Sequence, residues 1–251
     1  MSQAREGLVA GQLALVTGGS RGLGRAICEA LAREGADVGF CYARADADAA
    51  ATVEAIRTLG RRAWAFKASV IDAAAVKSMV TDLTAEVGPI RILVNNAGHS
   101  QVVPLALMEE EDWDRMLDTH VKGAFLVTKA VLRGMVREKR GRILNIGSLA
   151  GMKMMRAPVH YCTAKAALRG FTEAMAKEVG RYGITVNCLA PGILEEGVSE
   201  HLPQAQRDEY LRHCALGRVG TLVEAAEAAV LLLSERNRYM NGATVLLDGG
   251  V

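Results

Sequence analysis

Three side chains suited to proton transfer lie close together in the sequence: Ser148, Tyr161 thirteen residues later, and Lys165 four residues after that. The stretch that holds Tyr161 and Lys165 has a helical pattern, and residues four apart on a helix emerge on the same face. Ser148 follows an apolar run of strand length that ends at Gly147. In an open parallel sheet this is the edge where ligands bind. We therefore expect a hydroxyl, a phenol and an ammonium to surround one ligand.

The phenol needs assistance, because its unperturbed pKa near 10 makes it slow to exchange protons around neutral pH. Lowering that pKa by roughly 3 takes about 4 kcal/mol. An ammonium about 4 Å away supplies about that much at an effective dielectric constant near 20. We therefore expect Lys165 to lower the pKa of Tyr161 and Tyr161 to give a proton to a carbonyl oxygen. Ser148 would hydrogen-bond that oxygen as charge develops on it.

Each of these residues also has a structural interpretation. Ser148 could be a cap or turn hydroxyl, Tyr161 a half-buried aromatic residue and Lys165 a solvated helix residue. Their joint occurrence, in order, after the strands where an open sheet binds its ligand, favours the chemical interpretation.

A glycine-rich turn, Thr17–Gly24, follows the first apolar run and opens a helical pattern. Such a turn lets backbone N–H groups and a helix N-terminus approach a pyrophosphate. The spacing is Gly-x-x-x-Gly-x-Gly rather than the commoner Gly-x-Gly-x-x-Gly, and the alternative is a turn that binds nothing. We predict a dinucleotide site with these candidate contacts: Gly18, Ser20, Arg21, Gly22, Leu23 and Gly24.

The end of the second apolar run indicates which dinucleotide is preferred. An acidic residue that would hold a ribose 2′-hydroxyl is missing there, since the chain reads Phe40-Cys41-Tyr42-Ala43-Arg44. Arg21 and Arg44 could instead form guanidinium pairs with a 2′-phosphate. We expect NADP(H) to be preferred over NAD(H), and the alternative for either arginine is an ordinary surface position.

Apolar runs of strand length alternate with helical patterns throughout the chain. This alternation predicts an α/β fold: one Rossmann-type, doubly wound, seven-stranded parallel sheet with helices on both faces. We expect a single domain, 1–251, with a lid-like segment at about 193–213. The predicted strands are Leu13–Thr17, Val38–Tyr42, Ala63–Phe66, Ile90–Asn95, Arg142–Ile146, Ile184–Ala190 and Thr244–Asp248. The clearest helical patterns are Arg25–Glu34, Ala49–Leu59, Ala73–Val87 and Ala164–Arg181.

Composition excludes several other classes of protein. Thirty basic and 28 acidic residues leave a formal charge of +2, which argues against nucleic acid as a partner. Five scattered cysteines predict reduced thiols and no metal site. No apolar run approaches the roughly 20 residues of a membrane span. We expect a cytoplasmic protein with a small-molecule substrate and no membrane partner.

The chain resembles the short-chain dehydrogenase/reductase family over nearly its whole length. The resemblance rests on Thr17–Gly24, Asn95-Asn96-Ala97-Gly98, Ser148, Tyr161-x-x-x-Lys165 and Pro191-Gly192. Gly141-Arg142-Ile143, Ala215–Gly220 and the C-terminal Asp248-Gly249-Gly250 are most similar to the 3-oxoacyl-ACP reductase branch, which includes polyketide ketoreductases. The resemblance implies NADPH-dependent reduction of a 3-oxoacyl thioester, linked to ACP or CoA, in fatty-acid or polyketide biosynthesis. It also implies a homotetramer, with a dimer as the alternative.

The resemblance further implies the role of particular residues. Asn95 and Ala97 would line the adenosine side of the cofactor, Lys165 would bind its nicotinamide ribose, and Ile193 would touch the carboxamide. The cofactor would also contact Gly98, Tyr161, Pro191 and Gly192. Arg133 and Lys177 match positions that present basic residues to an acyl carrier protein, and a solvated helix face is the alternative.

Three positions depart from the family pattern. His120 stands where the family usually has the asparagine of its catalytic tetrad. An imidazole could replace that residue as a proton relay, or His120 could be a neutral packing residue, and the sequence leaves both open. Ser69 replaces an Asp that often meets the adenine. Glu196 replaces a Thr that often contacts the cofactor, and we expect it to point away from the pyrophosphate or to belong to an open lid.

The segment between Ser148 and Tyr161 should lie beside the substrate. Its methionines Met152, Met154 and Met155 would form a pliable apolar wall, with simple packing as the alternative. Lys153 and Arg156 could meet the phosphate of a phosphopantetheine or CoA. Two other functions remain open: oxidoreduction of another ketone or secondary alcohol, and a catalytically impaired protein that senses nucleotides.

Overall fold

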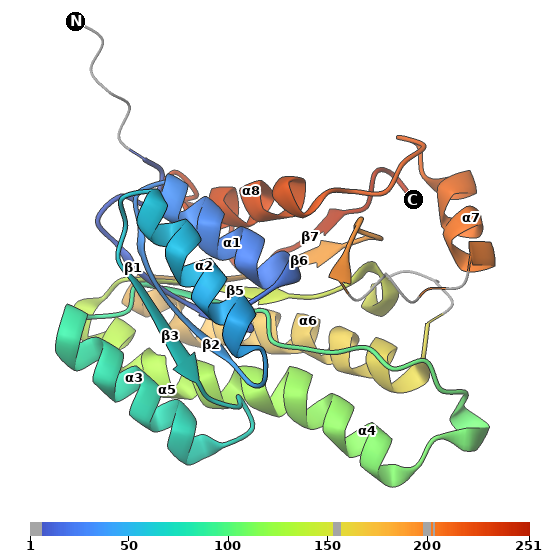
Figure 1. Ribbon diagram of the computed structural model, residues 1–251, viewed down its shortest axis with the longest axis horizontal. Helices are drawn as coiled ribbons and strands as arrows, with labels where there is room; N and C mark the ends of the chain where they lie inside the picture. The colour runs from blue at the N-terminus through green and yellow to red at the C-terminus, as the bar shows by residue number, and fades with distance from the viewer. Residues whose placement is uncertain (1–6, 153–156, 198–201, 203) are drawn as a thin grey trace, which may run out of the picture.

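All seven strands belong to one parallel sheet in the order β3-β2-β1-β4-β5-β6-β7 (Figure 1). The computed structural model describes residues 7–152, 157–197, 202 and 204–251. The strands are β1 Leu13–Thr17, β2 Asp37–Tyr42, β3 Ala63–Lys67, β4 Ile92–Asn95, β5 Gly141–Ile146, β6 Ile184–Pro191 and β7 Thr244–Leu247. The order reverses between β1 and β4, because chain connections leave β1 in one direction for β2 and β3 and return to its other side for β4. The predicted doubly wound fold is therefore confirmed.

Helices cover both faces of the sheet (Figure 1). On one face lie α1 Gly22–Arg33, α2 Asp46–Thr58 and α8 Leu222–Leu233, and on the other α3 Ala73–Val87, α5 Gly123–Glu138 and α6 Val159–Val179. Each face has its own buried cluster, the first around Ile27, Leu31 and Val230, the second around Leu83, Val131 and Met135. Because both faces are covered, the strands read as continuous apolar runs rather than alternating ones.

Two further helices border the carboxyl edge of the sheet. Helix α4, Glu110–Leu117, runs into a π-helical turn, Asp118–Lys122, which continues directly into α5. Helix α7, Gln204–His213, lies within the segment at about 193–213 that was predicted to be lid-like. The helix has few apolar residues, so its sequence shows no periodic apolar pattern from which a helix could be predicted. Its buried residue is Tyr210.

The predicted strand boundaries are within one residue of the structure except at β4, and three helices begin earlier than predicted: α1 at Gly22 rather than Arg25, α2 at Asp46 rather than Ala49, and α6. Strand β4 begins at Ile92 rather than Ile90. Helix α6 begins at Val159, five residues before the predicted start, because Pro158 supplies the cap position and the chain turns helical at once. The earlier start places both Tyr161 and Lys165 within the regular part of the helix.

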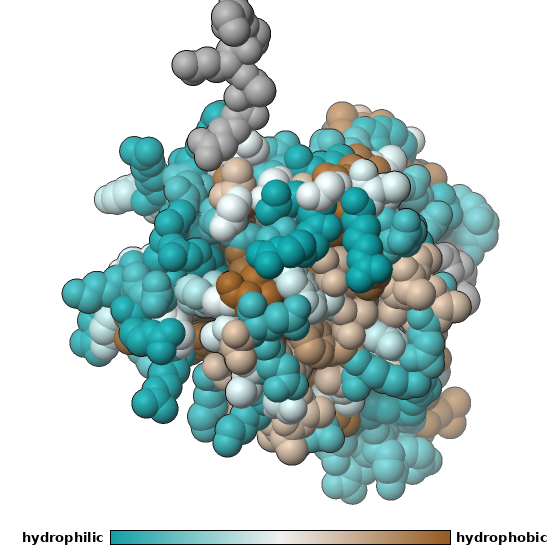
Figure 2. Space-filling model, turned by 60° about the vertical axis from the view of Figure 1, so that its left-hand side comes forward, coloured by the Kyte–Doolittle hydropathy of each residue, from teal (hydrophilic) through white to brown (hydrophobic). Residues whose placement is uncertain are grey.

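The surface shown in Figure 2 is mainly hydrophilic, with hydrophobic residues in small separate groups rather than in one broad patch. Among the helices within the described ranges, none combines the length and the apolar character that crossing a bilayer would need.

Candidate active site

The structure brings Ser148, Tyr161 and Lys165 together at the carboxyl edge of the sheet. Strand β5 ends at Ile146, and Ser148 follows it and caps a short 3₁₀ turn by accepting a hydrogen bond from the Ala150 N–H at 3.2 Å. Its side chain is also hydrogen-bonded to the phenol of Tyr161. The Nζ atom of Lys165 lies 5.7 Å from the centre of the Tyr161 ring. The grouping predicted from the spacing is thus present, and Ser148 serves as a cap as well.

The ionisation of these groups differs from the expected pattern. The pKa of Tyr161 is raised, chiefly by burial, while the hydrogen bond from Ser148 acts in the opposite direction. Lys165 does not reverse this, because its Nζ atom donates to the Ile146 carbonyl at 2.7 Å rather than to the phenol. Burial lowers the pKa of Lys165 to about 8, and its side chain is only 5% exposed. The lysine is thus the group whose charge changes nearest to neutral pH.

His120 lies in the π-helical turn and contacts the same tyrosine. The rings of His120 and Tyr161 meet edge to face, with centres 5.7 Å apart. The Nε2 atom of His120 lies 2.9 Å from the His99 carbonyl oxygen and 3.2 Å from the His99 nitrogen. Burial and the nearby Lys165 hold the pKa of His120 well below its usual value, so the ring is neutral at pH 7. A side chain added at Gly98 would overlap Cε1 of His120, so the glycine makes room for the ring.

The glycine-rich turn has the form that a pyrophosphate requires. Gly18 and Gly22 have φ angles of 68° and 52°, in the region that favours glycine. Gly24 packs against the Gly18 carbonyl so closely that any side chain would overlap it. Arg21, the residue before α1, makes no side-chain cap, and the first turn of α1 holds no acidic residue. The first N–H groups of this twelve-residue helix are therefore suited to an anionic group.

Asn96, which sequence reasoning did not single out, holds this turn in place. Its side-chain amide donates to the carbonyls of Thr17 at 2.9 Å and Gly18 at 3.2 Å. The hydroxyl of Thr17 in turn accepts hydrogen bonds from the N–H groups of Asn96 and Ala97. The Asn-Asn-Ala-Gly segment thus fastens the end of β4 to the end of β1. The motif itself was the available signal, but its partner is 79 residues away in sequence.

Asn95, predicted to line the cofactor, turns its side chain into the core instead. Its amide nitrogen donates to the Asn145 oxygen at 2.8 Å and to the Thr128 hydroxyl at 3.0 Å. The side chain is 5% exposed. Its contribution to a bound nucleotide would therefore come from its backbone or from its place at the end of β4.

The end of β2 presents positive charge, as the sequence indicated. Arg21 and Arg44 are both exposed, one in the glycine-rich turn and the other just after β2. The nearest acid in sequence, Asp46, is paired with Lys67 at 2.7 Å and hydrogen-bonded to Tyr42. Its charge is thus already neutralised. The surroundings fit a 2′-phosphate better than a 2′-hydroxyl that needs a carboxylate.

The end of β6 lies at the same carboxyl edge of the sheet, next to β5. Gly192 lies against the Tyr210 hydroxyl so closely that a side chain would overlap it, and Ile193 is 4% exposed. Tyr210 donates to the Asp248 carbonyl at 2.7 Å, which ties α7 to the chain after β7. Pro191 closes β6 itself.

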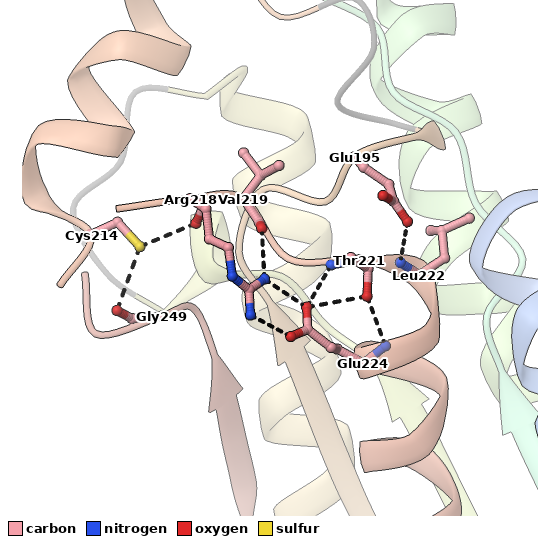
Figure 3. A network of polar contacts seen from close by, with 8 residues as sticks. All are labelled: Glu195, Cys214, Arg218, Val219, Thr221, Leu222, Glu224 and Gly249. Atoms are coloured by element: carbon pink, nitrogen blue, oxygen red, sulfur yellow. Dashed lines mark hydrogen bonds and ion pairs between the residues drawn. The ribbon is translucent and has the colours of Figure 1, made fainter. Parts of the chain in front are cut away.

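Polar contacts connect the segment after β6 to the start of α8 and to the chain after β7 (Figure 3). Glu195 accepts the Leu222 N–H at 3.0 Å, and Glu224 receives a two-pronged pairing from Arg218. Glu224 also forms a capping box with Thr221, and these partners lower its pKa to about 2. Cys214 contacts the Gly249 carbonyl at 3.5 Å. Glu195 is thus a structural cap at α8, and Glu196 beside it is exposed.

The remaining predicted residues are scattered or undescribed. Ser69, Arg133 and Lys177 are exposed, the last two on α5 and α6. Leu23 is half-buried in the first turn of α1, and Ser20 is buried. Lys153, Met154, Met155 and Arg156 lie outside the described residues.

The parallel sheet, the phosphate-binding turn at β1 and the serine, tyrosine and lysine at one edge define a dinucleotide-dependent oxidoreductase. Comparisons with known proteins agree. The model of the short chain dehydrogenase family matches residues 12–207. The chain therefore belongs to the short-chain dehydrogenase/reductase family, whose members use NAD(P).

Individual relatives cover nearly the whole chain. The 3-oxoacyl-[acyl-carrier-protein] reductase FabG of Escherichia coli is 38% identical over 242 residues, which is 96% of this chain and 97% of the relative. A short-chain dehydrogenase/reductase from Serratia marcescens is 34% identical with a TM-score of 0.90, covering 96% of this chain and 98% of that one. A gluconate 5-dehydrogenase from Burkholderia cenocepacia, in complex with NADP and tartrate, is 33% identical with a TM-score of 0.91, covering 98% and 97%.

Proposed function

We propose that the protein reduces the 3-oxo group of an acyl thioester to a hydroxyl with NADPH. The observation that carries the proposal is the grouping of Ser148, Tyr161 and Lys165 beside the glycine-rich turn. The thioester class is supported by FabG relatives, named as 3-oxoacyl-[acyl-carrier-protein] reductases, at 35% to 38% identity. The carrier of the acyl group is ACP or CoA in this proposal, and the pathway is fatty-acid or polyketide biosynthesis.

The chemistry divides between the cofactor and the chain. A bound NADPH would be the source of the hydride that reduces the carbonyl carbon. Tyr161 gives a proton to the carbonyl oxygen, and Ser148 hydrogen-bonds the same oxygen while charge grows on it. Lys165 supplies the positive charge that offsets the negative charge left on the phenol. The overall reaction consumes one ketone, one NADPH and one proton and gives one alcohol and NADP⁺.

The preference for NADPH rests on Arg21 and Arg44. Both are exposed near the end of β2, and Asp46 is already paired with Lys67. Guanidinium groups bind phosphate through two parallel hydrogen bonds, which a free 2′-hydroxyl would not need. Gly18, Ser20, Gly22, Leu23, Gly24, Ala97 and Gly98 would complete the nucleotide surface, with Pro191, Gly192 and Ile193 at the nicotinamide.

The wider assembly is part of the same proposal. Residues 1–251 would act as one domain, with the segment at 193–213 as a lid fastened at Glu195 and Tyr210. Arg133 and Lys177 are exposed and would face an acidic carrier protein. The protein would assemble as a homotetramer. A cytoplasmic location agrees with the five cysteines, all of which are free.

A direct assay tests the proposal. Purified protein would be mixed with NADPH and a short 3-oxoacyl thioester while the absorbance of NADPH is followed. We expect steady oxidation, and Tyr161→Phe should abolish turnover while NADPH still binds. Near-normal turnover by Tyr161→Phe would show that Tyr161 is not the proton donor. Turnover only of simple or sugar-derived ketones would replace the thioester as substrate, and binding without oxidation of any ketone would favour a nucleotide sensor.

A further inference from the structure

A small cavity lies between the ends of the central strands and the π-helical turn that holds His120. Its volume is about 10 Å³, which is about the space that one water molecule needs. The residues around it are Thr17, Val70, Asn95, Ala97, Thr119, His120, Gly123, Ala124, Ile146 and Leu168. Lys165 is not among them, although Ile146, whose carbonyl accepts a hydrogen bond from Lys165, is.

Two of the lining residues each have a buried polar atom that lacks a hydrogen-bond partner among the described residues. These atoms are Nδ1 of His120 and Oδ1 of Asn95. The side chains are 3% and 5% exposed. A buried polar atom without a partner is unfavourable, so two such atoms on residues that line one small space point to a shared ligand.

Both atoms are hydrogen-bond acceptors. Asn95 donates through its amide nitrogen to Asn145, whose own amide nitrogen donates to Thr172, so the orientation of both amides is fixed and Oδ1 of Asn95 is the oxygen. The ring of His120 is neutral and carries one N–H. Its Nε2 atom lies closer to the His99 carbonyl, at 2.9 Å, than to the His99 nitrogen, at 3.2 Å. We assign the single ring N–H to Nε2, on the side of the shorter contact, which leaves Nδ1 as the acceptor; the backbone N–H of His99 also points toward Nε2, and the ¹⁵N measurement below tests this assignment.

Two acceptors cannot bond to each other, but one water can donate to both. We propose that a single internal water joins Nδ1 of His120 to Oδ1 of Asn95, and that His120 so held is a positioning residue for Tyr161. The water fixes the tautomer, Nε2 fixes the ring to the backbone of His99, and the ring edge then sets the plane of the Tyr161 ring. His120 thus acts through Tyr161 and passes no proton. Only this catalytic consequence rests on the proposed function.

The water is tested first on the wild-type protein without substrate. A high-resolution crystal structure should show one ordered water within hydrogen-bond distance of both atoms. The ¹⁵N shifts of His120 should show a protonated Nε2 and an unprotonated Nδ1. An empty cavity, or a protonated Nδ1, would overturn the site. Neither measurement depends on turnover. If no ketone is reduced, the proposed function is refuted but the water site is not.

Variants then test the positioning role. His120→Phe keeps the ring and its edge contact but removes both nitrogen atoms, and we expect kcat to fall about 10-fold with KM for NADPH nearly unchanged. A kcat equal to that of the wild type in this variant would show that His120 serves only to fill space beside Tyr161. Val70→Ile adds a methyl group at the cavity wall and should expel the water and lower kcat similarly. Its control is Val131→Ile, which adds the same group in the same buried cluster but away from the cavity. Equal effects of the two isoleucines on kcat would overturn the role of the water.

Discussion

Replacing Lys165 with methionine should reveal how strongly the site resists a buried charge. Burial lowers the pKa of Lys165 from 10.5 to about 8. Between these values the unfolded chain holds a proton that the folded protein has already lost. Stability must therefore rise with pH across this window, since the unfolded state binds more protons. Below pH 8 both states are charged, and the folded state bears the full penalty of burial.

The size of the effect follows from the same two pKa values. They differ by about 2.5, and each pH unit corresponds to about 1.4 kcal/mol, so the wild type should gain roughly 3 kcal/mol between pH 8 and pH 10.5 relative to Lys165→Met. Methionine keeps a long apolar side chain and cannot ionise. The other lysines and tyrosines titrate in both proteins, so their contributions cancel in the difference.

Urea unfolding at fixed protein concentration, repeated from pH 7 to 10.5, measures this difference. A difference that stays flat with pH would refute the lowered pKa of Lys165. Activity gives a second reading. If the reductase needs the ammonium, kcat/KM should fall above a pKa of about 8, well before an ordinary lysine would titrate.

Three further changes have definite expected outcomes. Arg44→Ala should raise KM for NADPH about 10-fold or more and leave KM for NADH nearly unchanged. The reason is that a charge-assisted hydrogen bond to the 2′-phosphate contributes about 1.5–3 kcal/mol. Equal effects on both KM values would contradict the assignment of Arg44 to the 2′-phosphate. Gly98→Ala should displace the His120 ring and lower kcat, whereas Gly134→Ala, where an added side chain meets nothing within 4 Å, should not; steady-state kinetics of the pair decides. Thr221→Ala should lower stability by about 1 kcal/mol in thermal unfolding by removing the α8 cap, and Thr221→Ser should restore it; equal melting temperatures would show that Glu224 suffices alone.

Local patterns were enough to predict the sheet and the edge of it at which Ser148, Tyr161 and Lys165 lie. Strands buried on both faces leave apolar runs that can be read directly, and the carboxyl edge of such a sheet collects whatever follows each run. This is why Ser148, after β5, and Thr17–Gly24, after β1, were predicted near the same crevice. Helix α7 was missed because its sequence is polar, and its stability comes from Tyr210 contacting the distant Asp248.

What the sequence could not predict depends on contacts between distant residues. The pKa of Tyr161 was expected to fall, on the assumption of an ammonium about 4 Å from the phenol. Its direction is set instead by burial, which depends on how completely the neighbouring elements exclude water. Likewise, nothing near Asn96 in sequence shows that its amide holds the Thr17 and Gly18 carbonyls.

The pKa shifts at the site have a common cause with a mechanistic consequence. Burial favours the neutral form of each group, so it raises the pKa of Tyr161 and lowers those of His120 and Lys165. At pH 7 the phenol and the imidazole are neutral and Lys165 keeps its charge. In the proposed reaction Tyr161 would give up its proton, and this ammonium would offset the negative charge that remains. A neutral methionine at position 165 would remove this positive charge while the phenol stays buried. Below pH 8 we therefore expect Lys165→Met to be more stable than the wild type, because it lacks the buried charge, and to lose turnover for the same reason.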